Sequence, residues 1–496
     1  MNERSEEAAP IEHVVVCGSG LAAHMTVCAL SRRLPPSIRI TFANIGDNSG
    51  TDLFYGSASA PTAYSFNLSA GVSEPKLVLE SDAAFSWGTE YVEWPGGNRS
   101  WIQCFHLALP VIDGVLFHHY LARLGDAQLE RYLAPAVAAR RSAFVHPPQR
   151  PGQTGQHPLA RAEYGYQFDP ASYSRLFQSS TDNTRVRQVD GALAEVEVDE
   201  SGIASIRLLD GRSLEADLYI DASGPAAWLL SSLQPAFPVG RRLRAAMSRT
   251  PVAQLGAPLR QVLPASYGWR AETPLQGSTA LTTVYDPESE AEALSAHGSS
   301  PERSAEAAIG RRANAWSRNC VAVGHAARIV EPLTPAPLML LERDIERLLS
   351  LVPFSSEMSV ERREFNRRFV EDHEHADIFT RALFETDGLP DTPYWRAAWA
   401  DPVGEKLARK IELFEDRGVL VAYDLEPFHP EDWTILHYGM GRLAARYDRT
   451  ADRAQSAQVQ NLLSNLKREI DKAVEGLPSH AAYMTELKQY LLRNNR

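Results

Sequence analysis

The fold is decided by His13-Val-Val-Val-Cys-Gly18-Ser-Gly20-Leu-Ala-Ala23, a short apolar run that turns at two glycines. The run predicts a buried strand, and the residues after it predict a helix that reaches about Leu34. A second apolar strand over 38–44 follows the break at Pro35-Pro36. Strand, glycine turn, helix and strand within about 32 residues are typical of the βαβ unit of a doubly wound parallel sheet.

The glycine turn predicts a dinucleotide site. In Gly18-x-Gly20-x-x-Ala23 the first glycine makes the tight turn, the second lets backbone amides approach a pyrophosphate, and the third position only has to be small. Asn44 ends the second strand, where an acidic side chain usually binds the ribose; its amide can hydrogen-bond a diol, but without a charge. The alternative is a glycine-rich turn that binds no nucleotide.

Two later segments favour FAD over NAD. The stretches Leu218-Tyr-Ile-Asp221-Ala-Ser-Gly224 and Asn319-Cys-Val-Ala-Val-Gly324-His325 lie where two-domain flavoproteins return strands to the same sheet. Each could also be an ordinary buried strand that ends in a turn. Together with the βαβ unit they predict an FAD-binding architecture.

The composition excludes several classes of protein. With 44% apolar residues, 23% charged residues and a formal charge of −12, the 496-residue chain is globular rather than disordered, and its acidity gives no reason to expect a nucleic-acid partner. Its four cysteines have no metal-type spacing, which favours a reducing compartment. No run approaches the roughly 18 apolar residues of a membrane helix, so we expect a cytoplasmic protein without a membrane segment.

The pattern along the chain predicts two parts. Residues 1–345 form an FAD-binding α/β part, with β-rich substrate-side insertions at about 45–180 and 250–312. Residues 346–496 are mostly helical and complete the substrate cavity.

Over nearly its whole length the chain resembles the flavin-dependent halogenases of the tryptophan type. The resemblance implies the two-domain flavoprotein fold, bound FAD, an aromatic substrate and a separate reductase that supplies reduced flavin. It rests on the order and spacing of Tyr164-Gly-Tyr-Gln-Phe-Asp169, Ile220-Asp-Ala-Ser-Gly224, Asn319-Cys-Val-Ala-Val-Gly324, Val330-Glu-Pro-Leu333, Pro393-Tyr-Trp395 and Gly439-Met-Gly441.

The motif and the resemblance together predict a set of flavin contacts. They are Gly18, Gly20, Ala23, Asn44, Gly56, Ser57, Asp221, Gly224, Gly324, His325 and Leu333.

The family's catalytic lysine is missing from the matching position. In the family a lysine after Ala-Phe steers hypohalous acid to the substrate; here the stretch reads Ala84-Phe85-Ser86. Ser86 is a neutral donor and acceptor, and it cannot form a haloamine. Lys76 is the one lysine among the first 405 residues, and it lies ten positions away.

Other functional stretches of the family also differ. Glu-Pro-Leu-Glu-Ser-Thr reads Glu331-Pro-Leu-Thr334-Pro-Ala336, and Trp-x-Trp-x-Ile-Pro reads Trp269-Arg-Ala271-Glu-Thr273-Pro274. The flavin strap Gly-Glu-Ala-Thr-Val-Pro reads Gly56-Ser57-Ala-Ser-Ala-Pro61, and His325 stands where related monooxygenases have Asp.

These differences favour an FAD-dependent monooxygenase acting on an aromatic or heteroaromatic small molecule in specialised metabolism, such as antibiotic biosynthesis. Its candidate catalytic contacts are Ser86, Thr334 and Glu272. Halogenation of such a substrate is the alternative, and a non-catalytic halogenase-like partner protein is the second alternative. A homodimer is possible under all three hypotheses.

Two histidine pairs do not favour a metal site. His118-His119 fit packing or capping, and in His373-Glu-His375 the i and i+2 side chains of a helix point apart. We therefore expect no metal.

Overall fold

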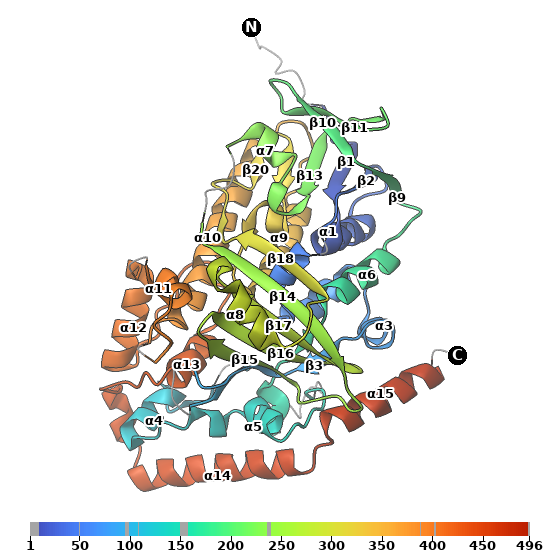
Figure 1. Ribbon diagram of the computed structural model, residues 1–496. Helices are drawn as coiled ribbons and strands as arrows, with labels where there is room; N and C mark the ends of the chain where they lie inside the picture. The colour runs from blue at the N-terminus through green and yellow to red at the C-terminus, as the bar shows by residue number, and fades with distance from the viewer. Residues whose placement is uncertain are drawn as a thin grey trace.

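The computed structural model describes residues 9–48, 50–94, 99–107, 109–148, 157–235, 240–386, 388–400 and 403–494. A parallel sheet lies at one end of the molecule and an antiparallel sheet in the middle, with the helices of the C-terminal part along one side and across the far end (Figure 1). The predicted α/β class with a β-rich insertion and a helical C-terminal region is confirmed.

The predicted βαβ unit is the centre of a six-stranded sheet. In it β1 (His13–Gly18) pairs in parallel with β2 (Arg39–Ile45) and β13 (Leu218–Ala222), and α1 (Gly20–Arg33) joins β1 to β2. The strand β21 (Cys320–Ala322) pairs with β13, so both later segments return to this sheet as predicted. The edge strands are β9 (Val186–Gly191) and β20 (Trp316–Ser317).

The β-rich insertions build a second, seven-stranded sheet. It takes strands from both predicted insertions, because β15 (Leu259–Ala265) of the later insertion pairs in parallel with β4 (Gly88–Tyr91) of the earlier one. Its order is β18 (Arg303–Ala308), β14 (Arg242–Pro251), β17 (Ser278–Tyr285), β16 (Gly268–Leu275), β15 (Leu259–Ala265), β4 (Gly88–Tyr91) and β5 (Trp101–Cys104).

The remaining strands of the described chain form one three-stranded sheet and three two-stranded sheets. The small strands are β3 (Ala84–Ser86), β6 (Val111–Ile112), β7 (Val115–Leu116), β8 (Gly165–Gln167), β10 (Leu193–Val198), β11 (Ile203–Leu208), β12 (Ser213–Leu214), β19 (Gly310–Arg311) and β22 (Arg328–Ile329). The short helices are η1 (Thr51–Tyr55), α2 (Thr62–Ser69), α3 (Glu74–Glu80), α4 (Phe117–Leu124), α5 (Ala134–Arg140), α6 (Pro170–Ser180), α7 (Leu230–Leu233) and α8 (Glu290–His297).

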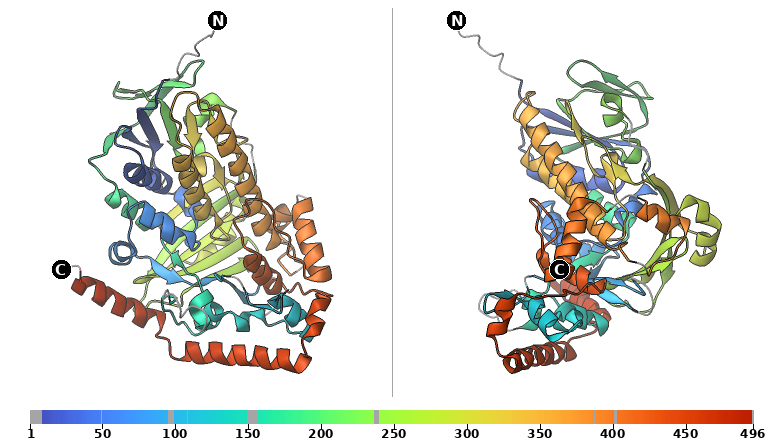
Figure 2. Two further views of the ribbon diagram at one scale, coloured as in Figure 1. Left: turned by 180° about the vertical axis from the view of Figure 1, so that it is seen from behind. Right: turned by 90° about the vertical axis from the view of Figure 1, so that its left-hand side faces the viewer.

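From residue 336 onward the described chain is mostly helical, as predicted. Seen from behind, α9 and α10 run side by side, and α14 and α15 cross the far end of the molecule (Figure 2). The helices are α9 (Ala336–Ser350), α10 (Ser359–Ala382), α11 (Pro393–Trp399), α12 (Glu405–Arg417), α13 (Pro430–Gly439), α14 (Ser456–Glu475) and α15 (His480–Asn494).

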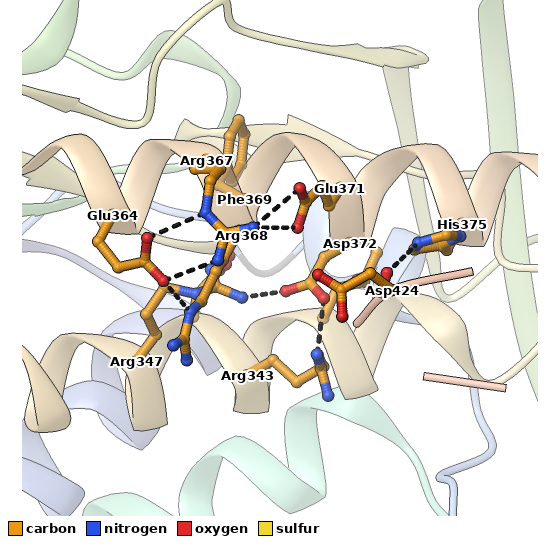
Figure 3. A network of polar contacts seen from close by, with 12 residues as sticks. Arg343, Arg347, Glu364, Arg367, Arg368, Phe369, Glu371, Asp372, His375 and Asp424 are labelled. Atoms are coloured by element: carbon orange, nitrogen blue, oxygen red, sulfur yellow. Dashed lines mark hydrogen bonds and ion pairs between the residues drawn. The ribbon is translucent and has the colours of Figure 1, made fainter. Parts of the chain in front are cut away.

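A buried ionic network joins α9 to α10. Asp372 of α10 lies between Arg343 and Arg347 of α9, with 2.9 Å from Nε of Arg343 to Oδ1 (Figure 3). Arg347 also bonds Asp344, whose carboxylate pairs with the buried Arg328. Each buried charge has a partner, so the network fixes how the two long helices pack.

Candidate functional site

The predicted nucleotide turn forms as expected at the start of α1. Gly20 has φ of +76°, a conformation that favours glycine, and Ser19 precedes the helix without capping it through its side chain. The first N–H groups of the helix are therefore free to bind an anion from outside the helix.

The acceptor at this helix end is the side chain of Asp52. The backbone N–H of Leu21 donates to Oδ2 of Asp52 at 2.8 Å, and a Cβ atom built on Gly20 would lie 2.6 Å from the same oxygen. Burial raises the pKa of Asp52 to about 7, although the Leu21 hydrogen bond and the more distant Arg303 act in the opposite direction. A carboxyl group thus occupies the place against Gly20 that the motif reserves for a pyrophosphate.

Asn48 fills the neighbouring part of the turn. Its backbone N–H donates to Oγ of Ser19 and its Nδ2 donates to the carbonyl of Ser19, both at 3.1 Å. A Cβ atom built on Gly224 would lie 2.5 Å from Oδ1 of Asn48. One side chain therefore joins the ends of β1 and β13, where the motif predicts the cofactor.

Tyr55 fills the space beside Gly324, at the end of the strand β21. Its ring stacks on His325 with 3.7 Å between ring centroids and 6° between planes, and the N–H of His325 donates to its hydroxyl at 3.0 Å. A Cβ atom built on Gly324 would lie 2.2 Å from that hydroxyl. Burial lowers the pKa of His325 to about 3, so its ring is neutral.

We call Asn48, Asp52 and Tyr55 the cleft residues. They contact Gly20, Gly224 and Gly324, three of the glycines predicted to lie against FAD. In this conformation the residues do not fit FAD, because protein atoms already occupy the places against these glycines where the motif predicts the cofactor.

Other predicted flavin contacts are also engaged elsewhere. Nδ2 of Asn44 donates to Oδ1 of Asp190 at 2.7 Å, on the exposed edge between β2 and β9. Asp221 is fully buried and accepts four hydrogen bonds, two of them from the N–H groups of Leu229 and Leu230 at the start of α7. Asp221 therefore stabilises a local turn. Gly18 and Ala23 keep their expected places in β1 and α1.

The predicted flavin strap packs directly on the substrate-side sheet. Oγ of Ser57 and Oγ1 of Thr273 form a buried hydrogen bond of 2.7 Å, and a Cβ on Gly56 would lie 3.3 Å from Cβ of Pro332. The carbonyl of Leu333 accepts hydrogen bonds from the buried Arg260 and from Tyr91.

The N-terminus of α9 has few free donors. The residues before this helix match the family's Glu-Pro-Leu-Glu-Ser-Thr stretch, but neither Pro335 nor Pro337 has an N–H. The N–H of Ala336 donates to Oγ1 of Thr334 at 3.2 Å. Thr334 therefore serves its own turn, and the capacity of this helix end to bind an anion is reduced.

Ser86, the residue in place of the catalytic lysine, is closed inside the protein. It is 1% exposed; its hydroxyl donates to the carbonyl of Gly88 at 3.0 Å and accepts from the N–H of Gly88 at 3.1 Å. Lys76 does not substitute for it, because its ammonium pairs with Glu80 and donates to the carbonyl of Ser179.

Replacing Ser86 with alanine is expected to lower the free energy of unfolding by about 1–2 kcal/mol, because the buried N–H of Gly88 loses its acceptor. Urea unfolding followed by circular dichroism measures the change. Replacing the exposed Ser65 with alanine is the control and should change stability by less than about 0.5 kcal/mol. If the Ser86→Ala protein is as stable as the wild type, the hydroxyl of Ser86 does not have this structural role.

Aromatic side chains fill the space around Phe85. Its ring stacks on Phe144 with 4.6 Å between centroids, and Tyr164 and Tyr483 meet its edges. Trp87 is fully buried and its Nε1 donates to the carbonyl of Ala143. These rings form the core beside Ser86.

The three predicted catalytic residues lie on separate elements: Ser86 ends β3, Glu272 lies in β16 and Thr334 precedes α9. Glu272 lies between Ala271 and Thr273 on β16, and successive residues of a strand point to opposite faces; both neighbours are fully buried, whereas Glu272 is half-buried. In the described part of the chain no hydrogen bond or ion pair joins any two of Ser86, Thr334 and Glu272.

The residues that sequence reasoning missed are the cleft residues. Asn48 and Asp52 follow a predicted strand in a polar segment without hydrophobic periodicity, so no local pattern indicates their burial. The nearest sequence signal is the strap over 56–61, which differs from that of the family and begins directly after Tyr55.

No group of histidine, cysteine and carboxylate side chains suited to a metal is found among the described residues. His118 instead bonds the carbonyl of Gly418, and His375 bonds that of Asp424. Within the described ranges, no helix combines the length and apolarity required to cross a bilayer.

Comparisons with known proteins identify similar sequences and similar solved structures. A sequence model described as tryptophan halogenase matches residues 13–456. Tryptophan 7-halogenase KtzQ of Kutzneria sp. (strain 744) is 24% identical over 445 residues, covering 82% of this chain and 81% of the relative. Two solved structures superpose with a TM-score of 0.87. They are BrvH, a flavin-dependent halogenase from Brevundimonas sp. BAL3 (26% identity, 96% of this chain, 99% of that chain), and Xcc4156, a flavin-dependent halogenase from Xanthomonas campestris (24%, 96% and 98%).

Proposed function

The chain belongs to the tryptophan halogenase family, and from this premise we propose that it keeps the family's architecture but works without bound flavin, as a non-catalytic partner protein. Family membership implies a flavin cofactor and an enzymatic origin. Membership of a family fixes the fold of the chain, but the function depends on the residues present at its sites.

The observation that carries the proposal is the carboxyl group of Asp52 against Gly20. A helix N-terminus can satisfy its N–H groups with a ligand or with a side chain, and here it uses a side chain. The stacked pair of Tyr55 and His325 supports the same conclusion at Gly324.

The reaction positions of the family support the proposal independently. Ser86 is neutral, buried and engaged in its own turn, and the start of α9 carries Pro335 and Pro337. Neither place offers an ammonium group or a set of free N–H groups to a reacting species.

A reductase-coupled assay tests the proposal. The protein would be incubated with FAD, NADH, a flavin reductase and bromide, with indole and phenol as substrates, and the products analysed by mass spectrometry. We expect no brominated and no oxygenated product, while BrvH assayed in parallel shows whether the reductase system works. Turnover above the reductase-only background would contradict the proposal.

Halogenation of an aromatic substrate is the second candidate function. The match of residues 13–456 to the tryptophan halogenase family favours it, and the comparisons support halogenation better than the oxygen transfer predicted from the sequence. Bromide-dependent product in the assay above would establish this candidate, with reduced flavin supplied by the reductase.

A further inference from the structure

A cavity of about 240 Å³ lies between β5, the short helix η2 (Leu129–Tyr132) and α13. The helices α13 and α5, which border it, lie in the lower part of Figure 1, away from the start of α1. None of its lining residues is a cleft residue or one of the three predicted catalytic residues. Its volume is slightly below that of typical drug-sized ligand sites, so it suits a small molecule.

Most of the cavity wall is apolar. Trp101 of β5 and Tyr438 of α13 both line it, and they are 5% and 4% exposed. The other apolar lining residues are Ile102, Ala127, Leu129, Leu133 and Ile435. Removal of apolar ligand surface from water favours binding, and two aromatic side chains in the wall favour an aromatic ligand.

Two arginines of the wall have no carboxylate partner. Arg131 of η2 is exposed, and its side chain makes no hydrogen bond or ion pair with any described residue. The exposed Arg99 donates from Nη2 to the carbonyl of Tyr438, which satisfies one of its five N–H groups but leaves its charge unpaired. Unpaired guanidinium groups beside an apolar wall favour a carboxylate ligand, because the planar group can donate two parallel hydrogen bonds to it.

The one carboxylate among the lining residues, Glu130, already has donors. Its Oε1 accepts Nε of Arg140 at 2.8 Å, and its Oε2 accepts the N–H of Ile102 at 3.1 Å. Two basic side chains and one acidic side chain give the wall a net positive charge, in a chain whose formal charge is −12. A cationic ligand would therefore find no unpaired carboxylate here, whereas an anionic ligand would find two guanidinium groups.

We propose that this cavity binds a small aromatic carboxylate, with its ring against the apolar wall at Trp101 and Tyr438 and its carboxylate bound by Arg99 and Arg131. The exposed side chain of Gln128, at the rim, supplies a further neutral donor. Binding here involves no flavin and no covalent step. It therefore goes beyond the proposed function and does not depend on it.

The probe is 2-naphthoate, a rigid aromatic ring system that carries one carboxylate. Isothermal titration of the full chain at pH 7 is expected to give saturable one-to-one binding with a Kd below about 1 mM. 2-Naphthamide has nearly the same shape without the charge, and it should bind about tenfold more weakly or less. Acetate has the charge without the ring, and it should also bind about tenfold more weakly or less.

Two variants at Arg131 locate the binding. Arg131→Gln removes one guanidinium group and should weaken binding of 2-naphthoate about tenfold, whereas Arg131→Glu reverses the charge and should abolish it. Because Arg131 is exposed and unpaired, both variants should unfold at the wild-type Tm. Arg187→Gln is the matched control, since Arg187 is exposed on the edge strand β9 of the other large sheet.

The expected result is binding of 2-naphthoate that is weakened in Arg131→Gln, lost in Arg131→Glu and unchanged in Arg187→Gln. If the wild type shows no saturable binding of 2-naphthoate up to about 5 mM, the proposal is wrong. Equal binding by Arg131→Glu, or equal binding of 2-naphthamide or acetate, also overturns it. Each of these failures leaves the flavin question untouched, because the titration contains no flavin.

Discussion

Replacing Asp52 with asparagine is expected to stabilise the protein by up to about 4 kcal/mol above pH 8 and to have little effect below pH 4. Asparagine has the same shape and its amide oxygen can still accept the N–H of Leu21. Burial raises the pKa of Asp52 from its ordinary value of 3.8 to about 7, so the folded state holds the proton more tightly than the unfolded state. Wild-type stability should therefore fall as the pH rises from about 4 to about 7, and the variant should lose this part of the decline.

Chemical unfolding at pH 5, 6, 7 and 8.5 measures the difference between the two proteins. Burial also raises the pKa of Glu342, to about 8, so a residual decline in Asp52→Asn is expected and should shrink further when Glu342→Gln is added. Glu486→Gln, on the exposed face of α15, is the control and should leave the pH profile unchanged. Parallel profiles for wild type and Asp52→Asn would show that this carboxyl group is not buried as described.

The βαβ unit was predictable because its signals are local. The apolar run over 13–17, the glycines after it and the break at Pro35-Pro36 each act within a few residues. The sequence also predicted that the strands ending near Asp221 and Gly324 join the same sheet. Parallel strands need long connections, and these connections bring the strand ends to one edge of the sheet.

The cleft residues could not be predicted, since their positions depend on contacts across the fold. Asp52 becomes a buried carboxyl group only because η1 turns back onto α1, which lies about 30 residues earlier in the chain. The face of β16 on which Glu272 lies could not be predicted for a related reason: the face that is buried depends on which elements pack against it.

The affinity of the protein for FAD is expected to be very low, because the place that the motif predicts for the cofactor must first be opened. FAD can reach the first turn of α1 only if η1 leaves it, which would expose Leu53, Phe54 and Tyr55, all now at most 3% exposed. At about 1.5–3 kcal/mol for each large apolar side chain, opening costs about 5–9 kcal/mol. That cost corresponds to an affinity about a thousandfold to a millionfold below that of a cleft that is already open.

The chain's own residues, rather than flavin, fill the nucleotide turn. Titration of the purified protein with FAD, in air and after anaerobic reduction, tests this statement most directly, with BrvH titrated in parallel as the flavin-binding control. We expect no saturable change in flavin fluorescence or absorbance up to about 100 μM FAD in either redox state. Saturable one-to-one binding at micromolar FAD would contradict it.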